Sequence, residues 1–166
     1  EKMDFIKVAK EEQVKQKPRA GSKYQGILSI CATEDQATAV RTIESLSEED
    51  GIIVLTSNRG RGKSSAMGMG LVSMALKAGK RLNVAVTSPS PESAGEVFSF
   101  AQKALDKEGV KSFMNEFSLS SKILSMRYYE LSDVPEGRDV YVVDEAAAMP
   151  VHEVQEVLRH ATKAIM

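Results

Sequence analysis

A run of small and basic side chains at residues 57–64 has the clearest chemical role in this sequence. It reads Ser-Asn-Arg-Gly-Arg-Gly-Lys-Ser, between a short β-rich run and an apolar helical pattern. Small residues at such a junction let backbone N–H groups converge on phosphate oxygens, and the helix N-terminus adds a favourable dipole. The pattern predicts a nucleotide phosphate site made by Ser57, Asn58, Arg59, Gly60, Arg61, Gly62, Lys63 and Ser64.

Individual residues of this loop have distinct expected roles. Lys63 is expected to reach the β- and γ-phosphates of the nucleotide, and the Ser64 hydroxyl is expected to hold Mg²⁺. Ser57 stands where the motif usually has glycine, and serine tolerates unusual backbone dihedrals less well. Arg59 and Arg61 add two cations, which would strengthen phosphate attraction, face a partner domain or lie in solvent; the sequence leaves these three roles open.

A second candidate site is the acidic pair Asp144 and Glu145, which follows four apolar residues at 140–143. Asp144 is expected to anchor Mg²⁺ through a water, and Glu145 to polarise the attacking water. With Lys63, these residues supply much of the positioning and charge stabilisation that phosphoryl transfer needs. Acids at a strand end also cap following helices, but the phosphate loop earlier in the chain favours the catalytic interpretation. A second carboxylate suits a water nucleophile, so hydrolysis is favoured over kinase chemistry.

Two further segments each have two interpretations. Gln36 lies where helicase-type motors use a glutamine to bind an adenine edge, but it is also the third helical residue after Thr33, where a capping box would bond it to backbone. Residues 87–90, Thr-Ser-Pro-Ser, follow a predicted strand where motor domains often contact a nucleic-acid backbone. Their alternative role is to cap the next helix.

The elements that must position these residues follow from hydrophobic spacing. Apolar runs predict strands at residues 51–56, 82–87, 123–129 and 140–143, with a final strand beginning as the chain ends. Helical spacing predicts helices at residues 33–46, 63–78, 90–105 and 153–159, and a short helix near 111–117. Strands that alternate with helices predict an α/β fold with a mostly parallel sheet flanked by helices.

The domain organisation is expected to be simple. Residues 1–30 are predicted to be a linker or N-terminal extension, because residues 1–25 are polar and lysine-rich and Pro18 and Gly21 break any helix. A solvated helix or a basic arm that touches RNA are the alternatives for this segment. Residues 31–166 are predicted to form one domain. The chain begins at Glu1 and stops within a strand-like run, so we expect it to be a piece of a longer polypeptide.

Composition excludes several protein classes. Lys and Arg number 22 against 23 for Asp and Glu, so net charge gives no sign of a nucleic-acid partner. No apolar run reaches the roughly 20 residues that span a bilayer. A single cysteine, Cys31, rules out an internal disulfide, and with only His152 and His160 beside it a zinc cluster is not expected. These three residues are expected to have structural or surface roles. The single cysteine fits a reducing cytoplasmic or nuclear compartment.

Taken together, the motifs resemble those of the RNA cytidine acetyltransferases, which make N4-acetylcytidine in tRNA and rRNA. The phosphate loop at residues 55–64 is similar to that family's loop, where serine or alanine is usual at the position of Ser57. The run Val-Val-Asp-Glu-Ala-Ala-Ala-Met-Pro at residues 142–150 resembles its acidic motif, which usually has isoleucine in place of Met149. Residues 35–37 and 87–101 are also similar, so the resemblance covers most of the chain.

The resemblance implies a RecA-like P-loop ATPase module that uses ATP and Mg²⁺. In this family Lys63 and Ser64 match nucleotide and metal contacts, Asp144 and Glu145 match the acidic pair, and Gln36 matches an adenine-side glutamine. It also implies an acetyltransferase domain in cis that uses acetyl-CoA, an RNA partner, no membrane, and a cytoplasmic location that is nucleolar in a eukaryote. That acetyltransferase domain and the later motifs are absent, so we expect an incomplete RecA-like domain, truncated at its C-terminal end, that binds nucleotide and hydrolyses it slowly.

Two other functions remain open from the sequence. One is the motor domain of a RecD-like helicase of superfamily one, which shares the same fold. The other is a scaffold that binds nucleotide without meaningful turnover, although Glu145 argues against it because a pure switch needs no acid to polarise water.

Overall fold

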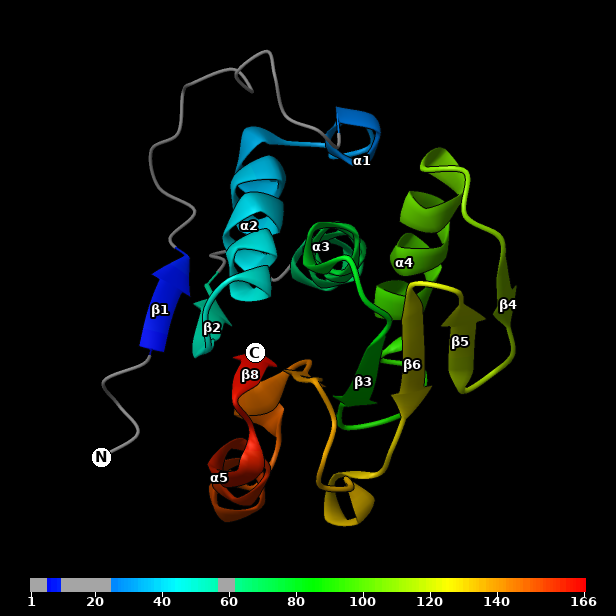
Figure 1. Cartoon of the computed structure of the whole chain (residues 1–166). Coiled ribbons are helices and arrows are strands. Elements are labelled where there is room, and N and C mark those ends of the chain that lie inside the picture. Colours follow the sequence, from blue (N-terminus) through cyan, green and yellow to red (C-terminus); the bar gives the residue numbers. More distant parts are fainter. Residues whose placement is uncertain (1–5, 10–24, 57–61) are drawn as a thin grey trace.

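A single eight-stranded sheet organises the computed structural model, which describes residues 6–9, 25–56 and 62–166. Figure 1 shows the sheet with helices on both sides. Its strands are β1 (Ile6–Ala9), β2 (Gly51–Leu55), β3 (Leu82–Thr87), β4 (Ser112–Met114), β5 (Ser118–Ser121), β6 (Leu124–Tyr128), β7 (Val140–Val143) and β8 (Lys163–Ile165).

The strand order across the sheet is β1-β2-β8-β7-β3-β6-β5-β4. All neighbours from β1 to β6 pair in parallel, whereas β5 pairs antiparallel with both β6 and β4. Strand β8 therefore lies between β2, which leads into the phosphate loop, and β7, which ends in the acidic pair. Because these strands are parallel, their carboxyl ends meet at one edge of the sheet. The predicted mostly parallel α/β fold is confirmed.

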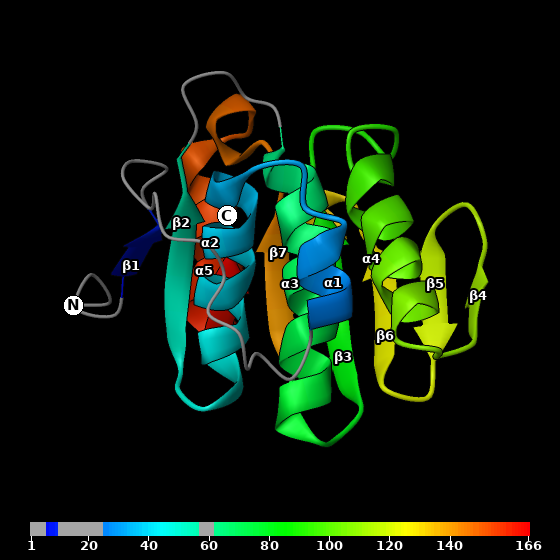
Figure 2. The same cartoon turned by 90° about the horizontal axis from the view of Figure 1, so that it is seen from above.

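Helices cover the two faces of the sheet unequally. In Figures 1 and 2, α2, α3 and α4 lie on one side and α5 on the other. The α-helices are α1 (Gln25–Ser29), α2 (Glu34–Glu44), α3 (Lys63–Ala78), α4 (Gly95–Lys107) and α5 (Val151–His160), and three 3₁₀ turns are η2 (Ser45–Ser47), η3 (Leu131–Asp133) and η4 (Ala146–Ala148). No helix in the described part of the chain is long and apolar enough to cross a membrane.

Helix α3 is the centre of the larger core. Every residue from Ser65 to Ala75 is buried, as the nearly continuous apolar pattern predicted. Glycines let its neighbours approach closely: a Cβ on Gly68 would lie 2.3 Å from the carbonyl oxygen of Val97 in α4. A Cβ on Gly70 would lie 2.7 Å from the Ile43 side chain of α2. Tight packing on both sides therefore fixes the N-terminus of α3, where nucleotide phosphates are expected.

A smaller core lies between the other face of the sheet and α5. Tyr141 of β7 and Val154 and Val157 of α5 belong to it. The buried Tyr141 hydroxyl donates to the carbonyl oxygen of Pro135 at 2.8 Å and so ties the segment before β7 to this core.

Most of the predicted elements are confirmed, several with the expected bounds. The strands at 82–87 and 140–143 and the helix at 63–78 end where the sequence indicated. The helix expected from Ser90 begins instead at Gly95, because residues 91–94 form a turn in which Ser90 accepts the Ser93 N–H. Strand β1 was not expected; it pairs with β2. The predicted domain boundary near residue 30 stays a prediction.

The short helix predicted near residues 111–117 is wrong. The structure has strand β4 there, followed by a turn and strand β5. The Asn115 side chain forms the turn, since its oxygen accepts the Phe117 N–H at 3.0 Å and the Ser118 hydroxyl at 2.9 Å. A run this short fits both the helical and the strand periodicity, so the turn formed by Asn115 decides which structure is adopted.

We expect Gly68→Ala to destabilise the protein by about 1–3 kcal/mol, because the added methyl group overlaps the backbone of α4. The matched control is Gly95→Ala, where a Cβ meets nothing within 4 Å and alanine should change the stability by at most about 1 kcal/mol, in the favourable direction. Urea unfolding followed by circular dichroism measures both. Equal stability of the two variants would contradict the close packing of α3 on α4.

Candidate nucleotide-binding site

A hydrogen bond between Ser64 and Asp144 joins the two predicted halves of the site. The Ser64 hydroxyl donates to Asp144 Oδ2 at 2.6 Å, although the two residues are 80 positions apart in the sequence. Ser64 is the second residue of α3, and Asp144 comes directly after β7. The fold therefore brings the predicted metal ligands into direct contact at the carboxyl edge of the sheet.

The surroundings of Asp144 suit a hard cation. This carboxylate is only 3% exposed, and its backbone N–H donates to the carbonyl oxygen of Thr87 at 2.9 Å, so β3 fixes its position. A buried carboxylate beside a hydroxyl provides oxygen donors, which Mg²⁺ prefers. The residues present thus fit the metal that the sequence implies.

Gly62 shapes the start of α3. It caps the helix with φ +87°, a left-handed conformation that glycine adopts readily. A Cβ here would also lie 2.6 Å from Gln36 Nε2, so even a residue that tolerated this backbone would collide. Among the described residues, no side chain caps this helix N-terminus, which leaves its first backbone N–H groups available to an anion.

Gln36 connects α2 to this helix N-terminus. Its Nε2 donates to the Ser65 hydroxyl at 2.9 Å and to the Gly62 carbonyl oxygen at 3.4 Å. Its Oε1 accepts the Ala32 N–H at 2.7 Å, and its own N–H donates to Thr33 Oγ1 at 3.1 Å. Both ends of the amide are therefore engaged with protein, in the backbone role that the capping pattern indicated. The adenine contact stays a prediction.

Glu145 has a backbone that few side chains adopt. Its φ of +55° is the one left-handed value at a non-glycine residue in the described part of the chain. Such a conformation costs about 1–2 kcal/mol, and strained residues cluster at functional sites. The side chain is exposed, next to the buried Asp144, where it can reach solvent water.

Hydrogen bonds to other residues of the protein hold the segment that follows β3 in place. Tyr128 donates its hydroxyl to the carbonyl oxygen of Ser88 at 3.1 Å, and burial raises the pKa of this phenol above its ordinary value, so it stays a donor. Ser88 donates to the Ser90 carbonyl oxygen. Thr87 and Ser88 are themselves buried, and Thr87 Oγ1 has no hydrogen-bond partner within the described ranges. Ser90 forms a turn before α4, so the predicted capping of this helix is wrong: its N-cap is Ala94, which makes no side-chain cap hydrogen bond. A nucleic-acid contact of residues 87–90 stays a prediction.

The other candidate residues are placed as follows. Lys63 is the first residue of α3 and is half-buried. Five predicted loop residues lie outside the described residues: Ser57, Asn58, Arg59, Gly60 and Arg61. Ser65 and Tyr128 were not predicted, because a hydroxyl inside an apolar helix and a tyrosine in a strand carry no motif. Burial raises the pKa of the Cys31 thiol to about 11, which makes it a poor nucleophile.

Comparison with protein families gives one clear match. The model described as RNA cytidine acetyltransferase NAT10/TcmA, helicase domain, matches residues 54–166. This range includes the end of β2, the start of α3 and the acidic pair.

Similar proteins include both archaeal and mammalian acetyltransferases. The tRNA(Met) cytidine acetyltransferase TmcA of Haloarcula marismortui is 39% identical over 137 residues, which cover 77% of this chain and 17% of that protein. TmcA of Thermococcus kodakarensis is 32% identical, with 75% of this chain and 16% of that protein covered. An RNA cytidine acetyltransferase of Mus musculus is 34% identical, with coverage of 80% and 15%. The chain thus spans about a sixth of the length of these relatives.

Solved structures with a similar fold include the large terminase of a thermophilic bacteriophage. It aligns with a TM-score of 0.62 at 16% identity, over 80% of this chain and 38% of that one. A structure of the same terminase in complex with ADP aligns with a TM-score of 0.58 at 18% identity, over 81% and 38% of the two chains. At this identity the likeness shows the fold alone, and it supports the predicted RecA-like P-loop ATPase fold.

We expect Gln36→Met to weaken the binding of ATP and GTP equally, by roughly fivefold, because the variant loses about 1 kcal/mol of hydrogen bonding that positions the start of α3. Fluorescence titration with labelled forms of both nucleotides measures this, with the exposed Gln155→Met on α5 as the matched control. A loss confined to ATP would instead indicate that Gln36 contacts the adenine ring.

Proposed function

Because this chain belongs to the RNA cytidine acetyltransferase NAT10/TcmA helicase-domain family, we propose that it binds ATP with Mg²⁺ and hydrolyses it. The observation that carries the proposal is the 2.6 Å contact between Ser64 and Asp144, which joins the phosphate-loop helix to the acidic strand end. Nothing in the packing of either element alone requires a buried carboxylate at this place.

Binding depends on the start of α3. The backbone N–H groups of its first turn are directed towards the phosphates, and the Lys63 ammonium adds a positive charge beside them. The Ser64 hydroxyl and the Asp144 carboxylate hold the metal, which supplies charge neutralisation on the phosphate oxygens when it is bound. The terminase with the same fold was solved in complex with ADP, which supports a nucleotide as the ligand of this fold.

Hydrolysis depends on Glu145. Its exposed carboxylate lies next to the buried metal ligand and accepts a proton from the attacking water as the water oxygen bonds to the γ-phosphorus. The bond from that phosphorus to the β–γ bridging oxygen breaks, and ADP leaves. The left-handed backbone at Glu145 turns the chain away from β7 directly after Asp144, so the two neighbouring carboxylates take different roles.

The wider role rests on the relatives, of which this chain spans about a sixth. We propose that ATP hydrolysis by this chain helps to position an RNA substrate for N4-acetylation of a cytidine. The acetylation itself is assigned to an acetyltransferase domain in cis that uses acetyl-CoA. The proposed location is the cytoplasm, or the nucleolus in a eukaryote.

We expect Lys63→Ala to weaken ATP binding at least tenfold, since the loss of a charged phosphate contact is worth about 1.5–3 kcal/mol. Glu145→Gln should bind ATP as the wild type does but hydrolyse it about 10²-fold more slowly, because it removes a general base and leaves the binding residues intact. Fluorescence titration and phosphate release measure the two quantities.

The matched controls are Lys107→Ala and Glu116→Gln, which change exposed residues of α4 and of the β4–β5 turn, outside the start of α3 and the acidic pair. Both should behave as the wild type does. If Glu145→Gln turns over ATP at the wild-type rate while Lys63→Ala loses binding, the chain is a nucleotide-gated scaffold and the proposed hydrolytic mechanism is wrong.

A further inference from the structure

Half of one sheet face lacks a covering helix in the described part of the chain. Helix α5 packs against β7 and its neighbours, and Figure 1 shows no helix beyond the short η3 turn on that side of β6, β5 and β4. The opposite face of these strands is covered by α3 and α4, with Leu119, Leu124 and Met126 in the larger core. The uncovered half therefore exposes the alternate side chains of the strands.

The strand residues that point outward on this half include no carboxylate among the described residues. Strand register places Phe113, Ser120, Ser125 and Asn83 in one row across β4, β5, β6 and β3. A second row places Ser118 beside Arg127. Arg81 joins the first row, because its guanidinium donates to Ser120 Oγ at 3.2 Å and to the Ser121 carbonyl oxygen at 3.1 Å. The Asp139 carboxylate accepts the Asn83 N–H at 2.8 Å and so borders the first row on its β7 side. The two arginines and the hydroxyl groups on the β6–β4 side therefore form the part that suits an anionic ligand.

Two aromatic side chains stand at the borders of this face. Phe113 is 82% exposed, although a phenylalanine on a strand usually packs against a neighbour. Tyr129 follows β6 directly, and the Arg127 guanidinium lies 5.8 Å from the centre of its ring. Arg138 donates to the Tyr129 hydroxyl at 3.3 Å and so fixes the ring. Tyr129 is partly buried against the smaller core, so Phe113 supplies the exposed ring of this face, and an exposed ring on a sheet can stack on an unstacked nucleotide base.

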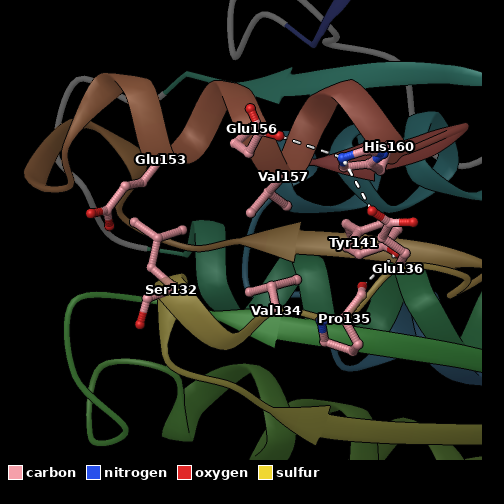
Figure 3. Close-up of a pocket in the computed structure, with 10 residues that line it drawn as sticks. Ser132, Val134, Pro135, Glu136, Tyr141, Glu153, Glu156, Val157 and His160 are labelled. Carbon is pink, nitrogen blue, oxygen red and sulfur yellow. Dashed lines mark hydrogen bonds and ion pairs between the residues drawn. The ribbon is translucent and has the colours of Figure 1, made fainter.

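An acidic hollow of about 390 Å³ borders this face on the α5 side. Figure 3 shows Glu136, Glu153 and Glu156 around it, with the His160 ring between Glu136 and Glu156 at 3.4 and 3.5 Å. The described residues that line the hollow include no lysine or arginine. Because phosphates are repelled here, an anionic strand on the sheet face must stay on the β6–β4 side.

We propose that the face formed by Phe113, Ser118, Ser120, Ser125, Arg127, Arg81 and Tyr129 binds single-stranded RNA. A base stacks on Phe113, the two arginines contact phosphates, and the hydroxyls of Ser120 and Ser125 bond to the sugar and phosphate oxygens. This inference rests on the proposed function for its choice of RNA as ligand. It assigns the RNA to a face of the sheet that the nucleotide motifs do not include.

The face is also connected to the nucleotide site through β3. Arg127 pairs in register with Ala85, and Thr87, two residues further along the same strand, accepts the Asp144 N–H. RNA bound to Arg127 would therefore contact β6, the neighbour of the strand β3 that positions Asp144.

The test is an anisotropy titration of the chain with labelled RNA of about 12 nucleotides, near the site size of such surfaces. We expect Phe113→Ser to bind roughly tenfold more weakly and Phe113→Trp to bind at least as well as the wild type, because stacking is lost in one variant and kept in the other. Arg127→Gln should weaken binding and reduce the slope of log affinity against log salt by roughly 0.7. The matched control, Lys107→Gln on α4, should change neither.

Duplex RNA of the same length should compete poorly, since its bases are already stacked. The proposal is overturned if Phe113→Ser and Arg127→Gln bind RNA as tightly as the wild type, or if duplex and single strand bind equally. Titration of the same variants with labelled ATP separates this outcome from a failure of the proposed function. If these variants still bind ATP, and Lys63→Ala abolishes that binding, the proposed function stands although the proposed RNA-binding face is wrong.

Discussion

The contact between Ser64 and Asp144 is the constraint on which the candidate site depends. It requires the start of α3 to lie within hydrogen-bond distance of the end of β7. Helix α3 follows β2, and β8 separates β2 from β7 in the sheet. A buried carboxylate is costly without a partner. The proposed metal site accounts for a buried carboxylate at this position, because Asp144 and Ser64 would hold the Mg²⁺ that neutralises the phosphate charge.

The packing of α3 makes that contact possible. A helix buried over eleven consecutive residues cannot shift along its axis without loss of contacts on two sides. Small residues set its distance from α2 and α4, and Gln36 then ties its first turn to the start of α2. The proposed nucleotide site is therefore positioned by core packing, while the polar residues at the edge would supply the chemistry.

Much of this arrangement could be predicted from the sequence, for definite reasons. Buried parallel strands such as β3 and β7 are continuous apolar runs, and α3 is apolar around its whole surface, so their bounds were clear. Ser64 and Asp144 were each assigned to Mg²⁺ from their motifs, and the gathering of parallel strand ends at one edge explains why the fold brings them together. The β4–β5 hairpin was missed because its turn depends on the Asn115 side chain, and the engagement of Gln36 with Ser65 was missed because it joins two helices that no local pattern relates.

The most direct test of the account is the Mg²⁺ dependence of ATP affinity in Asp144→Asn, with Asp106→Asn as an exposed control. The substituted amide keeps the size of the side chain and can still accept the Ser64 hydroxyl, but it is a much weaker ligand for a hard cation. The wild type and the control should gain affinity as Mg²⁺ is added, and Asp144→Asn should show little gain. A full Mg²⁺-dependent gain in Asp144→Asn would contradict the assignment of the Ser64–Asp144 pair as the metal site.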